Sequence, residues 1–155
     1  MEARLLSARP AHLEAAVAAL AFLDDRADRI QALIDIAGRY RDVPAEVATR
    51  PFEVARHVPG CESEAYVWAL PRQDGTLDFH IAVENPQGVT ARALAVLLVE
   101  GASGAPLASV MAIDAEIVHE VFGSELSIGK TMGLTGIVEA VRGLAAEHAL
   151  EARAT

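Results

Sequence analysis

The chain has 155 residues, of which 52% are hydrophobic and only 5% aromatic. A chain of this length buries about two-thirds of its surface on folding, so residues 1–155 are predicted to form a single domain with a core of small aliphatic side chains. The formal net charge of −9 excludes a generic nucleic-acid binder, because phosphate contacts need clustered Lys and Arg.

Two helices are predicted at the start of the chain. Apolar side chains recur every three or four residues over 11–23 and again over 25–40, with polar residues on the opposite faces. Because only Asp24-Asp25 interrupts the pattern, the two segments are expected to form an α-hairpin. Residues 41–51 contain two prolines and no clear period, which predicts an irregular connection.

A β-hairpin is predicted next. Residues 64–70 and 76–83 alternate between apolar and polar side chains, and the intervening residues 71–75 contain an Asp-Gly pair suited to a tight turn. Residues 52–58 are expected to add a third strand beside this hairpin. The sequence therefore predicts a small antiparallel three-stranded sheet.

Helical patterns fill the rest of the chain, over residues 87–99, 106–111, 114–122 and 130–148. The first of them follows Asn85-Pro86 and is apolar almost all round, so it is expected at the centre of the domain. The last contains Gly133, Gly136 and Gly143, which weaken a helix and favour close contact with a neighbouring segment. The fold class predicted is α+β, with several helices packed on the small sheet.

The only cysteine, Cys61, directly follows Pro59-Gly60 and precedes the polar residues 62–64. A free cysteine is usually a small buried hydrophobe. This one stands in a turn, and turns lie at the surface, so Cys61 is predicted to be an accessible thiol on a loop. Arg56 and His57 are candidates for lowering its pKa, whereas the acidic residues that follow would raise it.

Other kinds of site find little support. One cysteine cannot form an internal disulfide, and the histidines lack the spacing of metal ligands, so no metal site is predicted. No histidine–carboxylate dyad is evident near Cys61, which argues against a self-sufficient thiol enzyme. No leader pattern or apolar run of about 20 residues is present, which predicts a cytoplasmic protein without a membrane partner.

Several segments resemble one known family. Residues 58–63, Val-Pro-Gly-Cys-Glu-Ser, precede the aromatic hairpin and the apolar helix, and residues 126–134 read Leu-Ser-Ile-Gly-Lys-Thr-Met-Gly-Leu. This order resembles the SufE family of sulfur acceptors, whose pattern is Val-x-Gly-Cys-x-Ser followed later by Leu-Ser-x-x-Arg-x-x-Gly-Leu. The likeness extends over roughly residues 22–146. Departures from the pattern fall at Tyr66, Asn85, Lys130 and Met132.

The resemblance implies a SufE/IscU-like fold and a partner-dependent sulfur carrier. A SufS-like cysteine desulfurase would form a persulfide, and Cys61 would accept its sulfur and pass it to an iron–sulfur scaffold. No cofactor is expected on this chain, because pyridoxal phosphate belongs to the desulfurase. The residues expected to shape the loop or contact the partner are Arg56, His57, Gly60, Ser63, Asn85 and Lys130. The alternative is a non-catalytic interaction module that modulates a partner without carrying sulfur.

Overall fold

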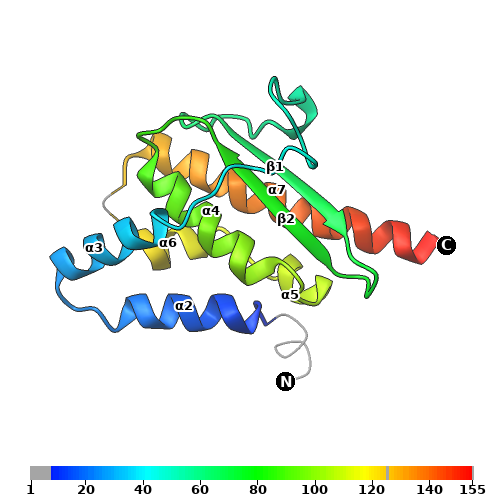
Figure 1. The fold of residues 1–155 in the computed structure, drawn as a ribbon. Helices are drawn as coiled ribbons and strands as arrows, with labels where there is room; N and C mark the ends of the chain where they lie inside the picture. Colours follow the sequence, from blue (N-terminus) through cyan, green and yellow to red (C-terminus); the bar gives the residue numbers. More distant parts are fainter. Residues whose placement is uncertain (1–7, 125, 155) are drawn as a thin grey trace.

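The computed structural model describes residues 8–124 and 126–154, and these form six α-helices, one 3-10 turn and a two-stranded sheet (Figure 1). In chain order the elements are α2 (Ala11–Ala21), α3 (Arg26–Ala37), η1 (Val54–Arg56), β1 (Ala65–Pro71), β2 (Leu77–Val83), α4 (Val89–Ala102), α5 (Leu107–Met111), α6 (Glu116–Phe122) and α7 (Ile128–Ala154). The predicted α+β class is confirmed, and α7 is longer than its sequence pattern indicated.

The β-hairpin forms as predicted. β1 and β2 pair in antiparallel register from Ala65 opposite Val83 to Pro71 opposite Leu77. Between them Gly75 adopts a φ of +87°, which glycine reaches without the steric cost that other residues incur. The Asp74 side chain accepts the backbone N–H of Thr76 at 3.0 Å and closes the turn. Local turn chemistry therefore suffices to set the hairpin register.

The third strand predicted over residues 52–58 does not form. Val54–Arg56 is a 3-10 turn, and only His57 forms a bridge, opposite Tyr66. The next two residues after Val58 are Pro59 and Gly60, and the positive φ of Gly60 turns the chain away from β1. Too few extended residues remain beside β1 to build a ladder.

The outer face of β1 is covered by aromatic packing. The Phe52 ring lies edge-on to the rings of Tyr66 and Trp68, with centroids 5.2 and 4.9 Å away. The Arg50 guanidinium lies 5.0 Å from the Phe52 centroid. These contacts fix the segment that leads into the cysteine loop against the sheet.

The core lies between the sheet and two long helices. α4 packs against β2 and α7 packs against β1, and the inward strand residues Val67, Phe79 and Ile81 are buried between them. Leu94 and Leu98 of α4 are fully buried, which confirms the predicted central position of this helix. Burial of each such side chain contributes about 1.5–3 kcal/mol relative to exposure.

The first two helices do not form the predicted α-hairpin, because both pack chiefly against α4. Arg29 of α3 explains part of this arrangement. Its guanidinium donates to the carbonyl of Leu20 at 3.2 Å and to that of Val121 at 3.0 Å, so it satisfies the C-terminal ends of α2 and α6 together. Within the described residues, no helix is long and apolar enough to cross a membrane.

Candidate thiol site

Residues 58–64, called the thiol loop here, close on themselves through backbone hydrogen bonds. The Val58 N–H donates to the Ala65 carbonyl at 2.8 Å, and the Glu64 N–H donates to the Cys61 carbonyl at 3.1 Å. Gly60 and Glu64 both adopt positive φ, +75° and +54°. The loop is thus a tight bend at the start of β1, with Cys61 near its middle.

Three glycines of α7 bring the helix backbone directly against the thiol loop. A Cβ built on Gly133 would lie 3.1 Å from the Cα of Cys61, and one on Gly136 would lie 2.9 Å from Val58 Cγ1. A Cβ on Gly129 would lie 3.1 Å from a carboxylate oxygen of Glu62. The spacing of the glycines by four and then three residues places them on one side of the helix, named the glycine face.

The side chain of Cys61 is buried, with 7% of its surface exposed, so the prediction of an accessible thiol is wrong for the resting structure. Its neighbours Gly60 and Glu62 are exposed, as turn residues are expected to be. Turn chemistry places the backbone at the surface but does not fix the direction of a side chain. Here Gly133 on the glycine face of α7 lies against the Cα and Cβ of Cys61, and the residue is buried beside the helix.

Cys61 adjoins a cleft of about 110 Å³. The cleft is lined by residues of the thiol loop, the start of α4 and the start of α7: Cys61, Glu62, Ser63, Asn85, Gln87, Gly88, Thr90, Ala91, Gly129, Lys130, Gly133 and Leu134. Sites for organic ligands usually measure about 300–1,000 Å³. The space beside the sulfur is therefore too small for a substrate of ordinary size.

Four of the residues predicted for the site meet at this cleft, and hydrogen bonds hold three of them in place. The Asn85 N–H donates to the Ser63 carbonyl at 3.1 Å, which ties the β2–α4 turn to the thiol loop. The Ser127 hydroxyl accepts the Lys130 N–H at 3.2 Å at the start of α7. Lys130 lines the cleft and makes no ion pair within the described chain.

Arg56, His57 and Gly60 do not line the cleft. His57 Nε2 lies 3.0 Å from a carboxylate oxygen of Glu64, so a histidine–carboxylate pair does exist beside the loop, contrary to the sequence expectation. The His57 ring packs on Tyr66 with centroids 5.1 Å apart. This pair therefore holds Glu64 of the thiol loop against the start of β1, outside the cleft.

Burial raises the pKa of the Cys61 thiol. Backbone N–H groups of Ser63 and Ala65 lower it in part, and the carboxylates of Glu64 and Glu62 raise it further. At neutral pH the resting group is accordingly a thiol with little thiolate. A thiolate is the nucleophilic form, so the resting conformation is not the reactive one.

Alkylation should show this suppression directly. We expect iodoacetamide to modify Cys61 more slowly in the folded chain than in guanidinium, with a pH midpoint above that of a free cysteine, about 8.5. Because the folded pKa is raised, this group stabilises the fold below the unfolded pKa, and the contribution is lost as pH rises through the folded value. Rates measured from about pH 6 to about pH 10 test the prediction. Equal folded and unfolded rates at neutral pH would contradict it.

The part of the site that sequence reasoning missed is the glycine face. Close contact was expected at Gly133, Gly136 and Gly143, and the structure shows it at the first two, whereas a Cβ on Gly143 would meet nothing within 4 Å. Gly129 was not singled out, and the partner segment was not identified. The spacing of 129, 133 and 136 along one helix side was the available signal. Gln87 and Thr90, at the start of α4, were also not expected at the site.

The geometry defines an α+β domain with one cysteine, recessed beside a cleft too small for an organic substrate. The chain belongs to the SufE family, because residues 14–145 match the family described as an Fe-S metabolism associated domain. It is therefore associated with iron–sulfur metabolism.

Several solved structures match the chain, and one of them illustrates the shared fold. It is the solution structure of a hypothetical protein from Thermus thermophilus, which is 21% identical and superposes with a TM-score of 0.70 over 92% of this chain and 98% of that chain. At this identity the likeness supports the fold alone. No curated protein sequence matches the chain.

Proposed function

We propose that this chain accepts a persulfide sulfur on Cys61 from a cysteine desulfurase and passes it on to iron–sulfur cluster assembly in the cytoplasm. The observation that carries the proposal is the thiol itself: it adjoins a cleft of about 110 Å³, which has room for an added sulfur atom but not for an organic substrate. The family's association with iron–sulfur metabolism supports the same role. A carrier needs no larger cavity.

The transfer is a thiol–disulfide-type exchange. The Cys61 thiolate attacks the outer sulfur of the desulfurase persulfide, a new S–S bond forms, and the old S–S bond breaks. The desulfurase cysteine leaves as a thiolate and takes up the proton that Cys61 lost. Electrons balance without an added oxidant or reductant. Pyridoxal phosphate would be bound by the desulfurase and not by this chain. On this chain, Lys130 supplies a positive charge near the anionic sulfur.

Cys61 has to leave its resting position for this exchange. A buried thiol with a raised pKa neither reaches a partner's persulfide nor attacks it efficiently. The contact with α7 suits such release, because glycines present no side chains that interlock with the loop. Docking of the desulfurase would draw the thiol loop off the glycine face and expose the sulfur at the same moment.

Exposed apolar residues are found next to the cleft-lining residues of α4 and α7. Ile128 and Met132 of α7 are 81% and 65% exposed, and Val89 at the start of α4 is also exposed. These three residues, called the apolar rim, are next to cleft-lining residues in the sequence. Apolar anchors of this kind, with a cation between them, are suited to a protein partner.

Substitution of the apolar rim should weaken docking. We expect Met132→Asp to raise the concentration of this chain needed for half-maximal sulfur transfer about tenfold, equivalent to about 1.4 kcal/mol. The matched control is Leu150→Asp, because Leu150 lies on the same helix and is also 65% exposed but is far from the cleft. Initial rates of sulfur transfer from a purified desulfurase provide the measurement. Equal effects of the two substitutions would show that the rim does not contact the partner.

The burial of Cys61 also favours a second candidate, the interaction module that binds a desulfurase without carrying sulfur. Intact mass measurement after incubation with desulfurase and cysteine separates the two functions. The carrier gains the mass of one sulfur on Cys61, and the gain disappears on reduction. A stable complex in which this chain keeps its original mass would support the module.

A further inference from the structure

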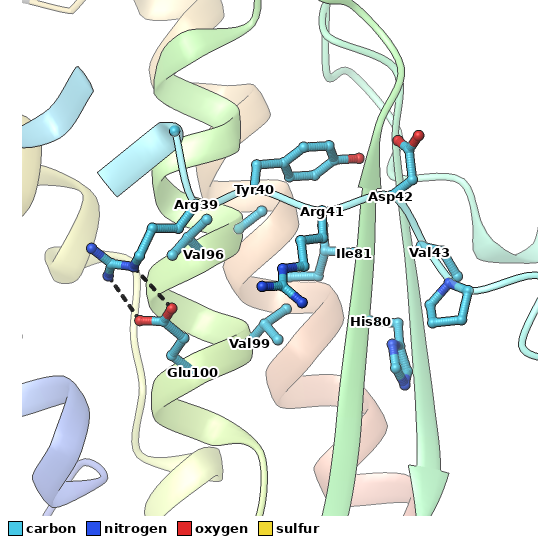
Figure 2. Close-up of a pocket in the computed structure, with 13 residues that line it drawn as sticks. Arg39, Tyr40, Arg41, Asp42, Val43, His80, Ile81, Val96, Val99 and Glu100 are labelled. Carbon is cyan, nitrogen blue, oxygen red and sulfur yellow. Dashed lines mark hydrogen bonds and ion pairs between the residues drawn. The ribbon is translucent and has the colours of Figure 1, made fainter. Parts of the chain in front are cut away.

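A larger cavity, of about 660 Å³, lies away from the thiol between residues 38–44, β2 and α4 (Figure 2). Its volume falls within the range of about 300–1,000 Å³ that is usual for sites of small organic ligands. On α4 it is lined by Ala95, Val96 and Val99, whereas the thiol cleft reaches only to Ala91. Ala91 and Ala95 are one helical turn apart, about 6 Å along the axis, and the two sites share no lining residue, so this cavity and the thiol cleft are separate sites.

Apolar side chains form two facing walls of the cavity, and His80 of β2 also lines it. Val96 and Val99 form the α4 side, and Ile81 of β2 faces them, as Figure 2 shows. Tyr40 closes one end, where its ring is held under the Arg92 guanidinium at 4.4 Å from the centroid. Such a slot takes a flat or branched hydrocarbon body.

Among the residues that the structure describes, one arginine lining the cavity has no partner. Arg39 forms a bidentate pair with Glu100, at 2.9 and 3.1 Å, and Asp42 lies 3.7 Å from Arg50. Arg41, between Arg39 and Asp42 in the chain, makes no hydrogen bond or ion pair with the described residues. Figure 2 shows its side chain directed between α4 and β2, above the apolar walls. An unpaired guanidinium in this position favours an anionic group on the ligand.

A free backbone position on β2 adds a second polar group. On the edge of β2 that faces away from β1, two backbone N–H groups have hydroxyl partners. The Val83 N–H donates to the Tyr40 hydroxyl at 2.8 Å, and the Phe79 N–H donates to the Ser103 hydroxyl at 3.0 Å. Ile81 lies between them on the same edge, because N–H groups alternate along a strand. No described residue outside the sheet bonds to it. Buried backbone groups are rarely left without a partner, and Ile81 is a buried residue that lines the cavity.

We propose that this cavity binds a small organic anion, namely a carboxylate with an aromatic or branched aliphatic body. The carboxylate pairs with the guanidinium of Arg41 in the planar two-point geometry that arginine offers. The body lies between the α4 valines and Ile81, and the Ile81 N–H donates to a further polar atom of the ligand. This site stands independently of the sulfur-carrier proposal, because none of its residues lines the thiol cleft.

Titration of the isotope-labelled full chain with 1-naphthoate tests the proposal by backbone-amide NMR. We expect saturable shifts centred on Ile81, Val96 and Val99. Two probes separate the contributions, since 1-naphthamide has the ring without the charge and acetate has the charge without the ring. Both should bind at least about tenfold more weakly than 1-naphthoate.

Arg41→Gln should weaken naphthoate binding about tenfold, and Val99→Trp should abolish it by filling the slot. The matched control is Arg72→Gln, which removes the same charge from an exposed arginine already paired with Asp78, and it should leave binding unchanged. Arg41 is exposed, so its replacement leaves the core intact. The proposal is overturned if no saturable shifts occur at the cavity, or if Arg41→Gln binds naphthoate as well as the unmodified chain does.

Discussion

Replacing Cys61 with serine is expected to abolish sulfur acceptance completely. Cys61 is the only cysteine in the chain, so no other side chain can form the new S–S bond. After incubation with desulfurase and labelled cysteine, the unmodified chain should carry label that reductant removes. The Cys61→Ser variant should carry none. Retention of reductant-sensitive label on the variant would remove the basis of the carrier proposal.

The variant must be shown to fold, because the side chain it changes is buried. Serine is close to cysteine in size, and its hydroxyl can accept hydrogen bonds from the backbone N–H groups of Ser63 and Ala65, which lower the pKa of the Cys61 thiol. We expect unfolding by denaturant to show a loss of about 1–2 kcal/mol at most, from burial of the more polar hydroxyl. Binding of the variant to the desulfurase should persist. Together these controls separate loss of chemistry from loss of structure or docking.

Elements specified by local patterns were predicted well from the sequence. The hairpin rests on alternation and on the Asp74-Gly75 turn, whose side-chain and φ requirements are met within a few residues. α4 was placed at the centre because it is apolar on all sides, and burial follows from that composition alone. Neither inference needed knowledge of which distant segments meet.

The features that depend on distant segments were not predicted. Cys61 is buried because Gly133, far along the chain, lets α7 reach its Cα, and nothing near Cys61 in the sequence encodes that approach. Arg39 and Arg41 likewise look equivalent in sequence. Glu100 on α4 lies where it pairs with Arg39. Arg41 has no partner among the described residues. The burial of Cys61 and the pairing of the two arginines both depend on contacts between segments that are distant in the sequence.

Gly133→Val is therefore expected to destabilise the chain and to activate the thiol together. A Cβ at this position would lie 3.1 Å from the Cα of Cys61 and 3.4 Å from the Gly60 carbonyl oxygen, and backbone atoms cannot rotate away as a flexible side chain does. Overpacking of this kind costs about 1–3 kcal/mol, and the small gain in helix propensity from replacing glycine does not offset it. The thiol loop should shift off α7, so Cys61 should become more exposed and react faster with iodoacetamide.

Gly143→Val is the matched control, because it changes the same residue type in the same helix where a Cβ would meet nothing within 4 Å. Its free energy of unfolding should stay within about 0.5 kcal/mol of that of the unmodified chain, and its alkylation rate should not change. Denaturant unfolding and alkylation of the three chains give both quantities. If Gly133→Val lowers stability without faster alkylation, α7 does not cover the thiol. If it does neither, the close contact is absent. Faster alkylation in the Gly133 variant alone would show that the close approach of α7 is what keeps the sulfur unreactive in the resting fold.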